Sequence, residues 1–103
     1  MAGGCDRVIY EEKDLKDLLV NLKDRKKEAK ALDKPDKEAE FLEHCLNFLE
    51  PYEKDILIKT FSERISIRKY SARSGFSRNF ISAQRDRSVR LLTKFFNVKF
   101  SSP

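Results

Sequence analysis

Apolar residues recur at intervals of three and four over most of the chain, which is the spacing of helices with one buried face. The first such stretch covers residues 10–32 and predicts one long amphipathic helix. Within it, residues 23–30 carry charged side chains on nearly all sides. Pro35 disfavours the helical conformation for Lys34, so we expect the helix to end within residues 33–36. The apolar stripe consists of Leu15, Leu18, Leu19, Leu22, Ala29 and Leu32.

Two further helices follow the break at Pro35. Residues 36–49 have a wide apolar face and predict a second helix that is more deeply buried than the first. Pro51 suits the first position of a third helix, which we expect to run to about residue 61. The inner side of this third helix is expected to hold Tyr52, Ile56, Leu57, Thr60 and Phe61.

A turn that contains glycine separates the last two predicted helices. Residues 66–74 favour a fourth helix, and a fifth begins near Ser77. Gly75 suits the left-handed conformation that ends a helix, while the hydroxyls of Ser66 and Ser77 suit helix N-caps. Two helices joined by a short turn of this kind form a helix-turn-helix. We therefore expect an all-α protein of about five helices: a helical hairpin over residues 10–49, then a helix-turn-helix over residues 50–97. Residues 1–9 and 98–103 are expected to be a flexible N-terminus and a tail.

The fifth helix has distinct inner and outer sides. At about 100° per residue, its inner side holds Ile81, Ser88, Leu92 and Phe95, with Gln84 nearby. The opposite side carries Asn79, Ala83, Asp86, Arg87 and Arg90, with Ser82 on the flank and Arg78 in the first turn. The first turns of such a helix can enter the major groove, where Arg pairs with guanine, Asn pairs with adenine and a small apolar side chain touches the thymine methyl group.

Charge is divided unevenly along the chain. Residues 1–50 hold ten Lys/Arg and thirteen Asp/Glu, a net charge of −3, whereas residues 51–103 hold twelve and four, a net charge of +8. From Arg64 onward, Asp86 is the one acidic residue against ten basic ones. A basic excess within a helix-turn-helix indicates a polyphosphate partner, and we expect double-stranded DNA.

Two segments resemble the C-terminal promoter-binding region of bacterial sigma factors. They are residues 49–57 (LEPYEKDIL) and 66–81 (SIRKYSARSGFSRNFI). The same pattern is similar to small phage and prophage transcription activators that use this region. The resemblance covers about half of the chain, from Leu46 to Phe96. The N-terminal half does not resemble other sigma regions, so a complete sigma factor is not expected.

The resemblance implies a set of DNA contacts. It places Arg78, Asn79, Phe80, Ser82 and Ala83 at base-reading positions, and the Ser77 hydroxyl near the phosphates. Together with Ser77, we expect phosphate contacts from Ser66, Arg68, Lys69, Arg73, Arg87 and Arg90. The chain departs from the family at Arg68 and Lys69, where acidic residues are usual, at Gln84, where an apolar residue is usual, and at Glu50, where leucine is usual before the proline.

Several functions fit these features. The leading hypothesis is a sequence-specific transcription regulator of phage or prophage type. A small terminase-type subunit that recognises packaging DNA is one alternative. Another is a helical adaptor that docks on RNA polymerase, or self-associates as a homodimer, through the N-terminal helices. The least specific interpretation is a helical domain whose basic face serves only solubility.

Other classes are not expected. His44 is the sole histidine, and no nucleophile with a nearby base and no phosphate-binding glycine loop is present, so neither an enzyme nor a cofactor is predicted. Cys5 and Cys45 lack the spaced pairs of a zinc site and are expected to be free thiols. The apolar runs are too short to cross a membrane, and residues 1–6 do not resemble a secretory signal, so a cytoplasmic location is expected.

Overall fold

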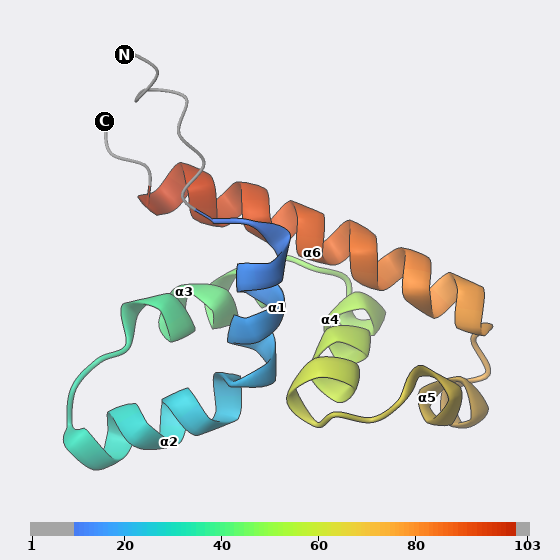
Figure 1. The fold of residues 1–103 in the computed structure, drawn as a ribbon, viewed down its shortest axis with the longest axis horizontal. Coiled ribbons are helices and arrows are strands. Elements are labelled where there is room, and N and C mark those ends of the chain that lie inside the picture. Colours follow the sequence, from blue (N-terminus) through green and yellow to red (C-terminus); the bar gives the residue numbers. More distant parts are fainter. Residues whose placement is uncertain (1–9, 101–103) are drawn as a thin grey trace.

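The computed structural model describes residues 10–100, which form six α-helices and one π-helical turn, with no strand in that range (Figure 1). The predicted all-α class is confirmed. The predicted N-terminus, with Cys5, and residues 101–103 lie outside the described residues. The elements are α1 (Glu12–Val20), α2 (Leu22–Leu32), α3 (Lys37–Leu46), α4 (Pro51–Leu57), η2 (Ile58–Ser62), α5 (Ile67–Ser74) and α6 (Arg78–Phe100).

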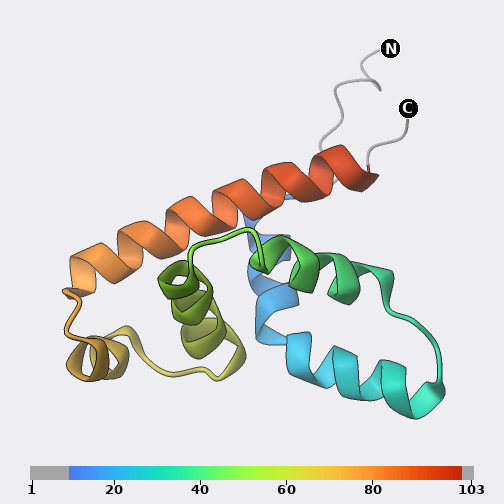
Figure 2. The same cartoon turned by 180° about the vertical axis from the view of Figure 1, so that it is seen from behind.

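The longest helix, α6, organises the fold. Its 23 residues span about 34 Å at a rise of 1.5 Å per residue. Figures 1 and 2 show α5 beside its first turns, while α1 and α4 run up against it. Helix α3 packs against it as well. Because α6 extends to Phe100, residues 98–100 belong to this helix and not to the expected tail.

The single helix expected over residues 10–32 is wrong, because the chain breaks at Asn21. This residue leaves helical geometry (φ −98°, ψ 6°). Its backbone N–H and its side-chain Nδ2 both donate to the carbonyl oxygen of Asp17, at 3.0 and 2.9 Å. A side chain that competes for a backbone acceptor in this way favours a local departure from the helix. After the break, α2 turns away from α6 and packs against α3 (Figure 1).

The third predicted helix also contains an irregular turn. Its first part is α4, and the chain then widens into η2, where the N–H of Glu63 donates to the carbonyl oxygen of Ile58 at 2.9 Å. The inner residues Ile56, Leu57 and Phe61 are buried as predicted, whereas Tyr52 is 38% exposed. The irregular turn therefore does not interrupt the buried face.

One large cluster of buried side chains draws on both predicted segments, residues 10–49 and 50–97. Leu15 and Leu19 of α1 have no exposed surface, and neither do Val89, Leu92 and Phe96 of α6. Burial of a leucine side chain contributes about 1.5–3 kcal/mol, so α1 supplies a substantial part of this core. The buried members of the cluster are Leu15, Leu18, Leu19, Leu22, Ala39, Leu42, Cys45, Leu46, Leu49, Leu57, Phe61, Val89, Leu92 and Phe96.

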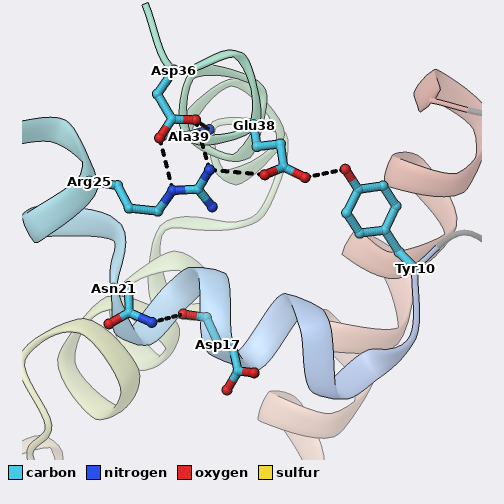
Figure 3. A network of polar contacts seen from close by, with 7 residues as sticks. All are labelled: Tyr10, Asp17, Asn21, Arg25, Asp36, Glu38 and Ala39. Carbon is cyan, nitrogen blue, oxygen red and sulfur yellow. Dashed lines mark hydrogen bonds and ion pairs between the residues drawn. The ribbon is translucent and has the colours of Figure 1, made fainter. Parts of the chain in front are cut away.

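A polar network joins α2 and α3 to the start of α1 (Figure 3). The Arg25 guanidinium donates to Asp36 at 2.8 and 3.0 Å and to Glu38 at 2.9 Å. The Tyr10 hydroxyl donates to the other oxygen of Glu38. The backbone of Tyr10 is in turn held by Asn97 of α6, whose Oδ1 accepts from the Tyr10 N–H at 2.8 Å and whose Nδ2 donates to its carbonyl at 3.0 Å. The network therefore links α2, α3 and the residues before α1 to one another, and through Asn97 to α6.

This network predicts a pH-dependent contribution to stability. Hydrogen bonds from Tyr10 and Arg25 hold the pKa of Glu38 below its ordinary value of 4.5. A carboxylate with a lowered pKa stabilises the fold fully above its ordinary pKa and loses this effect as the pH falls through the folded value. In urea titrations across pH, Glu38→Gln should therefore be less stable than wild type at neutral pH, and the difference should disappear in acid.

The matched control for this prediction is Glu40→Gln. Glu40 lies on the same helix and is exposed, and its side chain has no hydrogen bond or ion pair within residues 10–100. Its substitution should leave the pH profile of the free energy of unfolding as in wild type. A constant difference between Glu38→Gln and wild type down to acidic pH would contradict the assigned role of the Glu38 charge.

Candidate nucleic-acid interface

Local hydrogen bonds define both helices of the helix-turn-helix. The Ser66 Oγ accepts from the N–H of Lys69 at 3.1 Å and caps α5, and the Ser77 Oγ accepts from the N–H of Phe80 at 3.1 Å at the start of α6. Gly75 ends α5 in the left-handed conformation (φ 85°). No atom lies within 4 Å of a Cβ built on Gly75, so glycine is favoured there by the backbone angle alone. The capping roles predicted for Ser66, Gly75 and Ser77 are confirmed.

A second, smaller cluster of buried side chains packs these two helices against α4. Ile56, Tyr70 and Ile81 are its buried members and come from α4, α5 and α6. The Tyr70 hydroxyl donates to Asp55 Oδ2 at 2.6 Å. Burial, as the main cause, and this hydrogen bond, as the second, raise the pKa of Tyr70 to about 12. Tyr70 therefore remains a neutral donor at physiological pH and fixes the angle of α5 relative to α4.

Four residues in the first two turns of α6 face solvent, away from this cluster. Arg78, Asn79, Ser82 and Ala83 are all exposed. Within residues 10–100, no hydrogen bond or ion pair engages the side chains of Arg78, Asn79 or Ser82. Asp86 is exposed farther along the same side, and a carboxylate there is repelled by phosphates. The surface suited to base edges is therefore confined to these first turns.

Phe80 differs from the other predicted base-reading residues. Its ring is half-buried and lies 6.1 Å from the ring of Tyr52, with an interplanar angle of 25°, and 5.0 Å from the ring of Phe76. Aromatic pairs at this separation contribute about 0.5–1.5 kcal/mol beyond burial. The structure thus places Phe80 as a contact between α6 and α4, beside the exposed residues and not among them.

The predicted phosphate-contacting residues are also at the surface. Arg87 has no ion pair within the described residues, whereas Arg90 lies 3.9 Å from Glu12 in a pair in which both side chains are about half exposed. Exposed pairs of this kind contribute about 0–1 kcal/mol, so the Arg90 guanidinium is easily diverted to another anion. The exposed residues of this set are Ser66, Arg68, Lys69, Arg73, Ser77, Arg87 and Arg90.

Two basic residues near this surface were not predicted. Arg64 is exposed just before α5 and has a positive φ of 59°, which is uncommon for a non-glycine residue. Arg85 is half-buried, with its guanidinium carbon 4.3 Å from the centre of the Phe61 ring, and burial lowers its pKa. Arg85 comes four residues after the buried Ile81 and therefore lies on the same face of α6. This spacing indicates that its side chain faces inward.

Metal binding and thiol chemistry find no support within residues 10–100. No group of three or more His, Cys, Asp and Glu side chains there is placed to hold a metal ion. Cys45 is a buried free thiol, and burial raises its pKa to about 11, so it carries little thiolate at neutral pH. None of the described helices has the length and apolar character needed to cross a bilayer.

Comparison with known proteins identifies no relative of this chain. No family model, curated protein or solved structure matches the chain.

Proposed function

We propose that this chain is a sequence-specific, double-stranded DNA-binding transcription regulator. In this proposal, the first turns of α6 enter the major groove, where Arg78 and Asn79 contact base edges, while Ser82 and Ala83 lie against neighbouring bases. Phe80 positions these turns through its contacts with Tyr52 and Phe76. A sigma-like mode of promoter recognition and contact with RNA polymerase belong to the same proposal and derive from the sequence resemblance.

One observation carries the proposal. A capped helix presents exposed Arg and Asn side chains, free of intramolecular polar partners within residues 10–100, beside a second helix whose surface is basic. Neither α5 nor α6 has an acidic residue in its first turn, so both helix N-termini are compatible with an approaching phosphate. In this proposal, base contacts from the first turns of α6 give specificity, while phosphate contacts from α5 and from farther along α6 position the protein on the duplex.

The test has two stages. Selection from a random duplex library should enrich one short motif, and binding of that duplex should weaken steeply as salt is raised. Five of the expected phosphate contacts are cationic, and each releases about 0.9 counterion, so a plot of log K against log salt should have a slope of about −4.5. Fluorescence anisotropy at several salt concentrations measures this slope.

Two outcomes would contradict the proposal. If no motif is enriched, the exposed turns of α6 do not read bases. If affinity for the selected duplex does not change with salt, the basic side chains of α5 and α6 do not bind phosphates. A single-stranded oligonucleotide of the same sequence is the control, because the major-groove edges that α6 would read exist only in the duplex.

A further inference from the structure

An apolar groove lies between α3 and the C-terminal half of α6, at the end of the molecule away from the helix-turn-helix. Its volume is about 590 Å³. Phe48 and Val98 stand at this groove with 71% and 80% of their surface exposed. Contiguous exposed apolar patches are typical of interaction surfaces. The lining residues are Phe41, His44, Cys45, Phe48, Phe95, Val98 and Lys99.

The groove has the form that receives a helix. Leu91, Phe95 and Val98 follow one another at spacings of four and three on α6, and all three are at least partly exposed. An apolar stripe on α6 beside α3 suits the apolar face of an incoming helix. The anchor residues of such a helix are spaced i, i+3, i+4 and i+7. The occupant that fits is therefore an amphipathic helix.

The charged residues at the groove indicate the charge of its partner. Lys99 lines the groove, with its Nζ 5.9 Å from the centre of the Phe41 ring, and no carboxylate is among the lining residues. Lys94 is exposed on the same stretch of α6. After Asp86, every charged residue of α6 is basic. A helix with carboxylates on the flanks of its apolar stripe complements these cations, whereas a basic helix is repelled.

A second copy of this chain does not offer such a helix. Its exposed large apolar side chains within residues 10–100 are Leu32, Phe48, Tyr52, Leu91 and Val98. Phe48, Leu91 and Val98 belong to the groove and its stripe, which cations flank, so pairing α6 with α6 would bring like charges together. Leu32 is an isolated exposed position on α2, between Lys30 and Lys34.

We propose that the groove between α3 and α6 binds an acidic amphipathic helix of another protein. The apolar anchors of that helix lie between Phe48 and Val98, and its carboxylates lie beside Lys94 and Lys99. Val98 is 20 residues after Arg78, about 30 Å along α6, so the groove and the first turns of α6 can be occupied at the same time. This proposal goes beyond DNA binding and does not depend on it.

The experiment uses the full chain and three synthetic peptides of about four helical turns. One has leucine and phenylalanine at i, i+3, i+4 and i+7 with glutamate at the remaining positions. The second has the same composition in scrambled order, and the third has lysine in place of each glutamate. Fluorescence anisotropy with labelled peptides should give an affinity for the acidic helix at least about tenfold higher than for either of the other two.

Variants locate the binding surface. Val98→Glu and Phe48→Gln each alter a largely exposed side chain, and each should weaken binding of the acidic helix by about tenfold or more. Lys99→Glu should weaken binding too, and raising the salt concentration should reduce the difference between Lys99→Glu and wild type. Leu32→Glu is the matched control, because Leu32 is 61% exposed on α2 outside the groove. Thermal unfolding followed by circular dichroism checks that each variant folds.

The proposal is overturned if the three peptides bind equally, if none binds, or if Val98→Glu and Phe48→Gln both bind the acidic helix as wild type does. It is also overturned if analytical ultracentrifugation shows a dimer that Val98→Glu dissociates, because the groove then receives a second copy. Failure of the duplex selection with retained peptide binding would contradict only the DNA-binding proposal. Loss of peptide binding with retained DNA binding would contradict only the groove.

Discussion

Removal of residues 1–34 is expected to unfold the remainder of the chain. Leu15, Leu19 and Leu22 are buried at 0%, 0% and 4% exposure in the same cluster as Val89, Leu92 and Phe96. Without them, one side of α6 loses its apolar cover, and domains of this size have a total stability of about 5–15 kcal/mol. Circular dichroism of residues 35–103 should show reduced helix content and no cooperative thermal transition.

Point substitutions test the same contacts with less disruption. Leu19→Ala should lower the free energy of unfolding by about 2–5 kcal/mol, because it leaves a cavity in the large cluster. Leu32→Ala, at a position that is 61% exposed, should change it by less than about 0.5 kcal/mol. A cooperative transition of residues 35–103 close to that of the full chain would show that α3 to α6 fold without α1.

The second large effect is expected in DNA recognition. Arg78→Ala should weaken binding to the selected duplex by about 1–3 kcal/mol and change binding to a scrambled duplex little, if its guanidinium contacts a base edge. Lys69→Ala should weaken binding to both duplexes about equally and reduce the salt slope by about one unit, because a phosphate contact does not depend on sequence. Titration of each variant against both duplexes at two salt concentrations distinguishes these roles.

Lys27→Ala is the control for loss of a positive charge. Lys27 is exposed on α2, away from the helix-turn-helix, so its removal should leave both affinities nearly unchanged (Figure 1). Equal losses on both duplexes for Arg78→Ala would assign Arg78 to phosphate binding. If Arg78→Ala binds both duplexes with the affinity of wild type, the first turn of α6 does not contact DNA.

Local signals made the helix-turn-helix predictable. Ser66, Gly75 and Ser77 act through hydrogen bonds or backbone angles within a few residues, and these depend little on the rest of the fold. The exposure of Arg78, Asn79 and Ser82 follows from the same helical periodicity that buries Ile81 and Leu92. Whether these exposed residues contact DNA is a separate matter and stays a prediction.

Features that arise from long-range contacts were harder to predict. The leucine stripe of α1 passes through Asn21 into Leu22 without a change of period, so periodicity alone favoured one helix. On sequence alone, residues 10–49 were expected to form a helical hairpin. The packing of Leu15 and Leu19 with Val89, Leu92 and Phe96, at least seventy residues later in the chain, was not predicted. The groove was missed for the same reason, because Phe48 and Val98 come together only through the packing of α3 on α6.

The continuity of α6 has a consequence for how the molecule would sit on a duplex. The helix is one unbroken rod, whose last turns are anchored by Phe96 against Tyr10 and Phe41, with ring centres 5.1 and 5.0 Å apart. The first turns of the same helix pack on α4 and α5 through Ile81, so the packing at both ends of α6 sets the direction of the helix. Substitutions around Phe96 would therefore alter the docking angle of Arg78 and Asn79, so that sequence preference can evolve through residues that never approach the nucleic acid.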